Sequence, residues 1–322
     1  MIQKGDFKPA WWLPNAHAQT IWPALFRRRP KLRLCQQRLE LPDGDFLDLA
    51  HAGPRRAPTV LILHGLEGNL RSHYARGLLR ALERAGYHGV FLHFRNCGEE
   101  PNRLPRGYHS GETGDLQQVL EQLRERGGRP VRAAVGISLG GNVLLKWLGE
   151  KGEQDLLQSA MAVSVPFRLG DAGERLEYGW SRLYREHLMR KLRQSYRRKF
   201  QQVPSPLDVD VGQLRNFWEF DDRVTAPLHG FAGADDYYQR CSSRQFIPHI
   251  RTPTLILHAH DDPFMWPDTP PEADELPAAV TLELCDHGGH VGFVSGALPW
   301  RPKYWLEQRV LKHLAGLESD RS

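Results

Sequence analysis

The stretch VRAAVGISLGGNVLLKWLGE, residues 131–150, contains two kinds of secondary-structure pattern joined by a special turn. Its start, VRAAVGI, is mostly apolar, which is typical of a strand buried on both faces. Its end, LGGNVLLKWLGE, has the spacing of an amphipathic helix. Between them, Ser138 is flanked by Gly136 and Gly140. The pattern predicts a strained strand-to-helix turn that exposes the serine hydroxyl and leaves no room for side chains at the two glycines.

The same alternation of strand and helix patterns runs through most of the chain. Apolar strand patterns occupy residues 59–65, 89–94, 131–137, 159–165, 252–260 and 279–285. Helix patterns follow at 72–86, 114–126, 138–150 and 304–316. Residues 32–41 and 45–52 predict a β-hairpin. Alternating βα units of this kind predict an α/β fold with a doubly wound, mostly parallel sheet.

The long segment between the strand patterns at 159–165 and 252–260 has helical patterns and no strand pattern. It is too long for a loop inside a compact domain. We therefore predict a helical cap at 167–245, inserted into a core formed by 31–166 and 246–322. Residues 1–30, rich in Trp and Pro, are expected to be irregular and to pack on this core. Aromatic side chains of the cap are expected to line an acyl pocket: Trp180, Tyr184, Trp218, Phe220, Tyr237 and Tyr238.

Composition places the chain among ordinary globular proteins. It is 40% hydrophobic and 25% charged, with a net charge of +5. Its four cysteines form no CxxC motif, which fits a reducing compartment, and no apolar run approaches the roughly 20 residues of a membrane span. We expect a cytoplasmic protein. The basic stretch 182–200 predicts a solvated face, or else weak contact with an anionic membrane surface; no nucleic-acid partner is expected.

A nucleophilic serine needs a base, an acid and donors for an oxyanion. The stretch LHGLEGN, residues 63–69, follows a buried strand and predicts a loop that turns the N–H of Leu66 towards Ser138. With the N–H of Leu139, it would form a two-donor oxyanion hole. His64 is interpreted as a residue that holds the shape of this loop.

The acid and the base are expected after later strands. HDDPF, residues 260–264, provides Asp262 as the acid, with Asp261 as the alternative. DHGGHVGF, residues 286–293, provides His290 as the base, and its neighbour His287 is interpreted as shaping the loop. The order Ser138, Asp262, His290 along the chain is the order found in α/β hydrolases.

A metal site is the alternative interpretation of the same histidines and aspartates. His258 and His260 share one face of a strand end, and His287 follows the next strand. The HxHxDH pattern of binuclear hydrolases is absent, however, and a metal would leave the Ser138 turn unexplained. We expect neither a metal nor a cofactor.

The chain resembles the YheT-type branch of the α/β-hydrolase superfamily, which is related to eukaryotic abhydrolase-domain esterases and lipases. The matching stretches extend over nearly the whole chain: LELPDGDFLDLA, HGLEGN, PNRLPRGYHSGET, GISLGGN, HGFAGADDYY, HDDPFM and HGGHVGF. The resemblance implies an α/β-hydrolase fold with a helical cap, a triad at Ser138, Asp262 and His290, and activity on carboxylic esters. The turn NCGEEPN, residues 96–102, departs from the family pattern without touching the triad.

These observations predict a serine hydrolase that cleaves esters with short or medium acyl chains, including monoacylglycerol-like lipids, through an acyl-enzyme on Ser138. The substrate is expected to be a small-molecule ester. Two alternatives remain: an acyltransferase that uses the same three residues, and a non-catalytic binding protein that has this fold. The oligomeric state is not indicated by the sequence.

Overall fold

The structure, a computed structural model, describes residues 1–319. Within these residues the large sheet has nine strands in the order β1-β9-β8-β7-β6-β4-β5-β3-β2. Strand β3 is antiparallel to β2 and β5, and the other neighbouring pairs are parallel. The predicted doubly wound, mostly parallel sheet is therefore confirmed. The bounds are β1 (Ile2–Lys4), β2 (Cys35–Glu40), β3 (Phe46–Ala52), β4 (Thr59–Leu63), β5 (His88–His93), β6 (Ala133–Ile137), β7 (Ala160–Val163), β8 (Thr254–Ala259) and β9 (Val280–Cys285).

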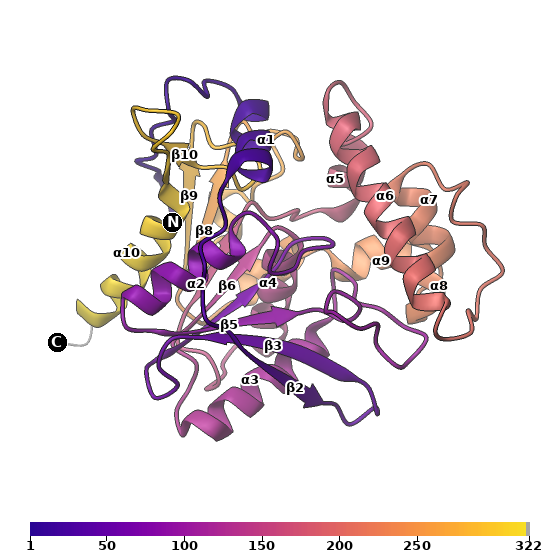
Figure 1. Cartoon of the computed structure of the whole chain (residues 1–322). Helices are drawn as coiled ribbons and strands as arrows, with labels where there is room; N and C mark the ends of the chain where they lie inside the picture. The colour runs from indigo at the N-terminus through magenta and orange to yellow at the C-terminus, as the bar shows by residue number, and fades with distance from the viewer. Residues whose placement is uncertain (320–322) are drawn as a thin grey trace.

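Helices cover both faces of the sheet (Figure 1). On one face lie α2 (Ala75–Arg84) and α10 (Trp305–Ser319), which bury leucines such as Leu78 and Leu314 against the strands. On the other face lie α3 (Thr113–Gly127) and α4 (Leu139–Lys151). Because both faces of the central strands are covered, their side chains are buried on both sides, which explains the continuous apolar runs in the sequence.

A group of helices is inserted between β7 and β8 and forms a separate lobe beside the sheet (Figure 1). These helices have an apolar cluster of their own, which includes Met189, Leu214 and Phe220. They fall within the range 167–245 predicted for the cap: α5 (Leu169–Arg175), α6 (Ser181–Phe200), α7 (Phe217–Phe220), a π-helical turn (Asp221–Thr225), α8 (Ala226–His229) and α9 (Ala234–Cys241). A 3-10 turn, η2 (Arg244–His249), leads to β8, and a second, η3 (Ala273–Glu275), precedes β9.

The expectation that residues 1–30 are irregular is wrong. Strand β1 extends the sheet beside β9, and α1 (Ala16–Phe26) follows it. Strand β1 is too short for an alternating pattern to reveal it. It is held by backbone pairing with β9 and by the side chains of Gln3 and Lys4, which contact Glu283 and Asp286. Helix α1 contains Pro23, and it begins where the Asn15 side chain accepts the N–H of Ala18. A second unpredicted element is the small hairpin of β10 (Val294–Ser295) and β11 (Lys303–Tyr304). No helix within residues 1–319 has the length and apolarity to cross a bilayer.

Candidate active site

Ser138 lies in the turn between β6 and α4 with φ of 53° and ψ of −117°, a backbone conformation that costs free energy for a residue with a side chain. The two flanking glycines are needed because the turn is closely packed. A Cβ atom at Gly136 would lie 2.5 Å from the carbonyl oxygen of Gly140, and one at Gly140 would lie 2.6 Å from that of His64. The turn therefore has the form expected from the Gly-x-Ser-x-Gly pattern.

His290 and Asp262, from the loops after β9 and β8, lie beside this serine. Nε2 of His290 is 3.0 Å from Oγ of Ser138, and Nδ1 of His290 is 2.9 Å from Oδ2 of Asp262. The Asp262 side chain is buried, with 4% of the residue exposed, and its Oδ1 accepts the N–H of Phe264 at 2.9 Å. The structure thus joins the three predicted residues in one chain of hydrogen bonds.

The charge state of Asp262 follows from two opposing effects. Burial acts to raise the pKa of its carboxyl, but the nearby His290 ring and the hydrogen bonds to the carboxylate hold the pKa below its usual value. An ionised Asp262 accepts a hydrogen bond from the N–H at Nδ1 of His290. That hydrogen bond leaves Nε2 as the nitrogen that can accept the proton of the Ser138 hydroxyl.

The alternative acid, Asp261, has other partners. Its Oδ2 is 3.2 Å from Nδ1 of His287, and its Oδ1 accepts the N–H of Gly289 at 2.9 Å. Both contacts hold the loop that carries His290 without reaching the His290 ring. Asp261 and His287 therefore shape the loop.

The loop after β4 approaches the serine closely, as the LHGLEGN stretch predicts. A Cβ atom at Gly65 would lie 3.2 Å from Cβ of Ser138. Within residues 1–319, the backbone N–H groups of Leu66 and Leu139 have no hydrogen-bond acceptor. The Tyr108 hydroxyl accepts the next N–H, that of Glu67, at 2.6 Å. Two unpaired donors are therefore held beside the serine.

His64 is buried beneath this loop. Its Nε2 accepts the N–H of Phe94 at 3.1 Å, while its Nδ1 is 2.7 Å from the carbonyl oxygen of Gly65. Burial lowers the pKa of His64 to about 3, so the ring is neutral. These contacts agree with the interpretation of His64 as a residue that holds the loop.

Helix α1 also supports the site, which the sequence analysis did not predict. The Thr20 hydroxyl accepts the N–H of His290 at 2.9 Å. The buried Gln19 side chain donates to the carbonyl oxygens of Leu13 and Val294 and accepts the N–H of Val294 at 2.7 Å. The contacts with His290 and Val294 join residues 270 and 275 positions apart, so no local sequence pattern could reveal them.

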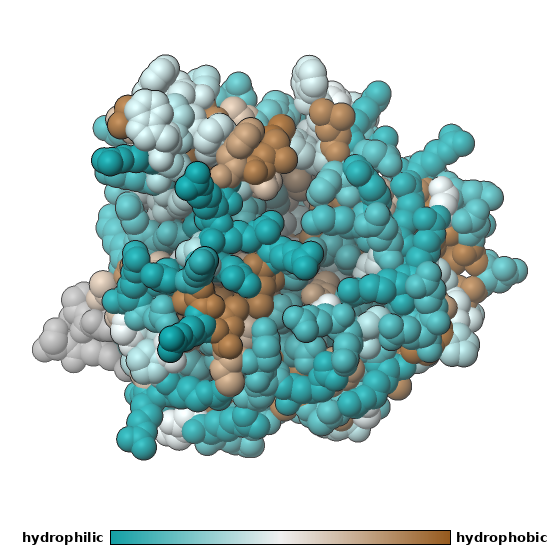
Figure 2. All heavy atoms as spheres, viewed as in Figure 1, coloured by the Kyte–Doolittle hydropathy of each residue, from teal (hydrophilic) through white to brown (hydrophobic). Residues whose placement is uncertain are grey.

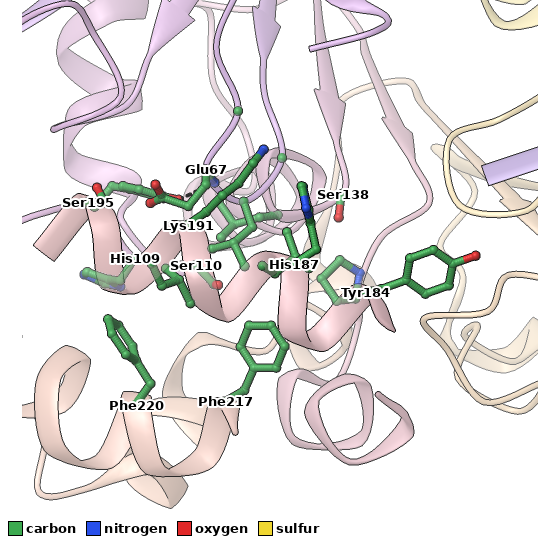
Figure 3. A pocket seen from close by; sticks show the side chains of 18 of the residues that line it. Glu67, His109, Ser110, Ser138, Tyr184, His187, Lys191, Ser195, Phe217 and Phe220 are labelled. Atoms are coloured by element: carbon green, nitrogen blue, oxygen red, sulfur yellow. Dashed lines mark hydrogen bonds between the residues drawn. The ribbon is translucent and has the colours of Figure 1, made fainter. Parts of the chain in front are cut away.

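A cavity of about 750 Å³ lies between Ser138 and the inserted helices. Figure 3 shows the α6 side chains Tyr184, His187, Lys191 and Ser195 along the cavity, with His187 and Tyr184 at the end nearest Ser138, and Phe217 and Phe220 of α7 pointing towards α6. Tyr184, Phe220, Tyr237 and Tyr238 line the cavity as predicted.

The prediction for the other two cap aromatics is wrong. Trp180 and Trp218 are 73% and 48% exposed and do not line the cavity. Trp180 lies at the tip of the turn that leads into α6, and the indole N–H of Trp218 donates to Asp235 at 3.1 Å. Both side chains therefore point outward, which helical spacing alone could not indicate.

The histidines and carboxylates of the metal alternative include two separate pairs, His287 with Asp261 and His290 with Asp262. His258 is buried beside Phe167, and burial lowers its pKa to about 4. Across residues 1–319 there is no group of three or more His, Cys, Asp or Glu side chains that could hold a metal ion. The described residues therefore provide no ligand set for this alternative.

The sheet and the serine turn define the class of α/β-fold hydrolases. The family described as alpha/beta hydrolase fold matches residues 58–297, and the chain belongs to this family. It is 45% identical over 312 residues to YheT of Escherichia coli (strain K12), an esterase by name, covering 95% of this chain and 92% of that one. It is 29% identical over 324 residues to the phospholipase ABHD3 of Mus musculus, covering 95% and 77%. The family is of the esterase and lipase type.

A solved structure shows the same fold. The esterase EaEST of Exiguobacterium antarcticum superposes with a TM-score of 0.53 at 17% identity, covering 87% of this chain and 100% of that one. At this level of identity the likeness concerns the fold alone.

Proposed function

We propose that the protein hydrolyses carboxylic esters through an acyl-enzyme on Ser138. The observation that carries this proposal is the continuous hydrogen-bonded chain from Asp262 through His290 to Ser138, at the wall of a cavity of about 750 Å³. The same chain of contacts recurs on several unrelated folds that use a serine hydroxyl as a nucleophile. The family membership supports a hydrolase of the esterase type.

In the proposed reaction, Oγ of Ser138 attacks the ester carbonyl carbon and Nε2 of His290 takes the hydroxyl proton. The carbonyl oxygen becomes an oxyanion that accepts the N–H groups of Leu66 and Leu139, each donor stabilising it by about 3 kcal/mol. The C–O bond to the alcohol then breaks, and the leaving oxygen takes the proton from His290. Asp262 stays ionised and keeps the imidazole oriented.

A water molecule completes the cycle. His290 removes a proton from the water, whose oxygen attacks the acyl carbon and forms a second oxyanion in the same hole. The bond to Ser138 breaks and its oxygen recovers the proton from His290. The products are a carboxylic acid and an alcohol, and no cofactor enters the reaction.

The lining of the cavity supports a proposal about the substrate, namely esters with short or medium acyl chains, including monoacylglycerol-like lipids. Apolar side chains such as Leu188, Phe217 and Phe220 can surround an acyl chain. Each buried methylene contributes about 0.8 kcal/mol, or roughly fourfold in kcat/KM. We expect kcat/KM to rise with chain length until the chain reaches the wall formed by the inserted helices, and then to fall.

The test is a series of p-nitrophenyl esters from acetate to palmitate, assayed with the parent protein and Ser138→Ala. Ser138→Ala should reduce turnover by about 10⁴-fold or more and abolish labelling by a fluorophosphonate probe, with an unchanged circular dichroism spectrum. Labelling that survives the substitution would overturn the role of Ser138. A parent protein that neither labels nor hydrolyses any ester would indicate the non-catalytic alternative. Ester products in the presence of an added alcohol would indicate acyl transfer.

A further inference from the structure

Exposed apolar side chains are concentrated around the mouth of the cavity. Twelve large hydrophobic side chains are exposed within residues 1–319, and nine of them lie on two prominences. The α1 prominence comprises Trp11, Ile21, Leu25, Phe26, Leu298 and Trp300, and the α6 prominence comprises Tyr178, Trp180 and Leu183. Figure 2 shows hydrophobic spheres over α1 and over the tip that leads into α6, with a hollow between them.

The α1 prominence is one continuous surface. The indole N–H of Trp11 donates to the carbonyl oxygen of Ala297 at 2.9 Å, next to Leu298. Trp12 packs edge-on against Trp22, whose ring lies 4.5 Å from that of Phe26. The N-terminal segment, the loop before β11 and α1 therefore share one aromatic surface.

The two prominences flank the entrance to the active site. Ile21 and Leu25 line the cavity on the α1 side, and Leu176 and Tyr184 line it next to the α6 prominence. The N-terminal turns of α1 and α6 are in contact, because Nδ1 of His17 lies 2.9 Å from the Tyr184 hydroxyl. A flat surface that covered both prominences would therefore cover the entrance.

Cations without carboxylate partners surround the same entrance. Arg29, Arg71 and Lys191 line the cavity, and Arg182 lies between Trp180 and Leu183 in the sequence. In the part of the chain that the structure describes, none of these four forms an ion pair with Asp or Glu. Elsewhere on α6, Arg185 and Arg193 pair with Glu177 and Glu186, and Arg198 and Lys199 donate to backbone carbonyl oxygens. Arg190 and Arg197 are exposed and add to the positive charge of this helix.

Water is a poor solvent for such a surface. Contiguous apolar patches beside an active site usually mark an interaction surface. Tryptophan and tyrosine suit the boundary between lipid headgroups and acyl chains, because each combines an apolar ring with a polar group. Lys and Arg side chains near an anionic lipid surface are attracted by its negative potential. The combination of aromatic tips and unpaired cations fits an anionic bilayer.

We propose that the α1 and α6 prominences dock on the surface of a membrane that contains anionic phospholipid, with the entrance of the cavity facing the lipid. The membrane contact is then centred on the apolar tips at the entrance, and the basic stretch 182–200 contributes Arg182 and Lys191 to it. An ester dissolved in the lipid would pass between the prominences to Ser138, a consequence that rests on the proposed ester hydrolysis. The docking itself does not depend on it.

The test is co-sedimentation of the full chain with two kinds of vesicle, one of phosphatidylcholine alone and one that also contains about 30% phosphatidylglycerol. The anionic lipid gives the second kind a negative surface potential. The parent protein should bind the mixed vesicles and be released by salt. Trp180→Ser with Leu183→Ser, and separately Trp11→Ser with Trp300→Ser, should each weaken binding at least tenfold. Trp218→Ser is the matched control, because Trp218 is exposed outside the two prominences.

Hydrolysis of p-nitrophenyl acetate in solution, measured in parallel, separates docking from catalysis. All these variants should retain this activity, because none of the substituted residues lines the cavity. Double variants that bind like the parent protein, or a parent protein that does not bind the mixed vesicles, would overturn the proposal. The proposal would also be overturned if the parent protein were a dimer and either double variant converted it to a monomer. A second copy of the chain would then cover the surface. Vesicle binding without ester hydrolysis would contradict only the proposed function.

Discussion

The ring of Phe264 lies flat against the ring of His290, with centroids 3.9 Å apart and an angle of 3° between the planes. The backbone N–H of the same Phe264 donates to Oδ1 of Asp262. On its side towards the inserted helices, Phe264 packs against Tyr184, at 4.9 Å between centroids. One residue thus contacts the proposed base, the proposed acid and α6, so the orientation of the imidazole depends on the packing of the inserted helices.

Phe264→Leu tests this relationship. Leucine keeps an apolar side chain but removes the flat face that limits rotation of the imidazole. Because an aromatic pair contributes about 0.5–1.5 kcal/mol beyond its buried area, we expect kcat to fall by up to about tenfold with little change in KM. Steady-state kinetics on p-nitrophenyl butyrate measure the effect. Phe264→Tyr keeps the ring and should retain kcat, so an equal loss in both variants would contradict the stacking role.

Asp262→Asn and Asp261→Asn separate the two adjacent carboxylates. Only the carboxylate of Asp262 contacts Nδ1 of His290, so its replacement should favour the wrong tautomer of the ring. We expect kcat to fall by about 10⁴-fold in Asp262→Asn and by less than about tenfold in Asp261→Asn. The rate of fluorophosphonate labelling provides a second measurement. A larger loss in Asp261→Asn would assign the acid role to Asp261.

Gln19→Ala tests the contribution of α1. The substitution removes three buried hydrogen bonds that connect α1 to Leu13 and Val294. Each buried group left without a partner costs about 1–3 kcal/mol, so the midpoint of urea unfolding should fall. Because Val294 lies just beyond the His290 loop, kcat should fall by about tenfold as well. The matched control is Gln36→Ala on the exposed edge strand β2, which should change neither quantity. A loss of stability without a loss of kcat would mean that α1 does not position His290.

Glu67→Gln tests a half-buried carboxyl in the cavity wall beside the proposed oxyanion hole. Burial raises the pKa of Glu67 from 4.5 to about 7, and this rise exceeds the opposing effects of hydrogen bonds from Tyr108 and Ser195 and of the charges of Lys191 and Arg198. Between pH 4.5 and 7 the native state keeps a proton that the unfolded state loses. The contribution of Glu67 to the free energy of unfolding therefore falls as pH rises through this range.

Glutamine does not titrate, so Glu67→Gln should gain stability relative to the parent protein as pH rises from 4.5 to 8, by up to about 3 kcal/mol. Urea unfolding of both proteins at several pH values measures this difference, and the titration of all other groups cancels in the comparison. Glu125→Gln, an exposed position on α3, is the matched control. A difference between Glu67→Gln and the parent protein that stays constant with pH would contradict the raised pKa.

Features that depend on neighbouring residues could be predicted from the sequence. The alternation of apolar runs and amphipathic segments predicted the mostly parallel sheet, because strands covered on both faces must be apolar throughout. The pattern around Ser138 predicted the strained turn, because only glycine leaves room beside a backbone folded that tightly. The order Ser138, Asp262, His290 along the chain indicated which loops supply the proposed triad. All of this information lies within short stretches of the chain.

Contacts between distant residues were decided only by the tertiary structure. The sequence favoured Asp262 over its neighbour Asp261 without separating them, and the packing of the loops after β8 and β9 places Asp262 against His290 and Asp261 against His287. Helix α1 reaches the His290 loop through Gln19 and Thr20, and Trp180 points away from the cavity that Tyr184 lines. The physical reason is the same in each case. A side chain acquires its partner when segments far apart in sequence pack together, and a local pattern of polar and apolar residues carries no record of that partner.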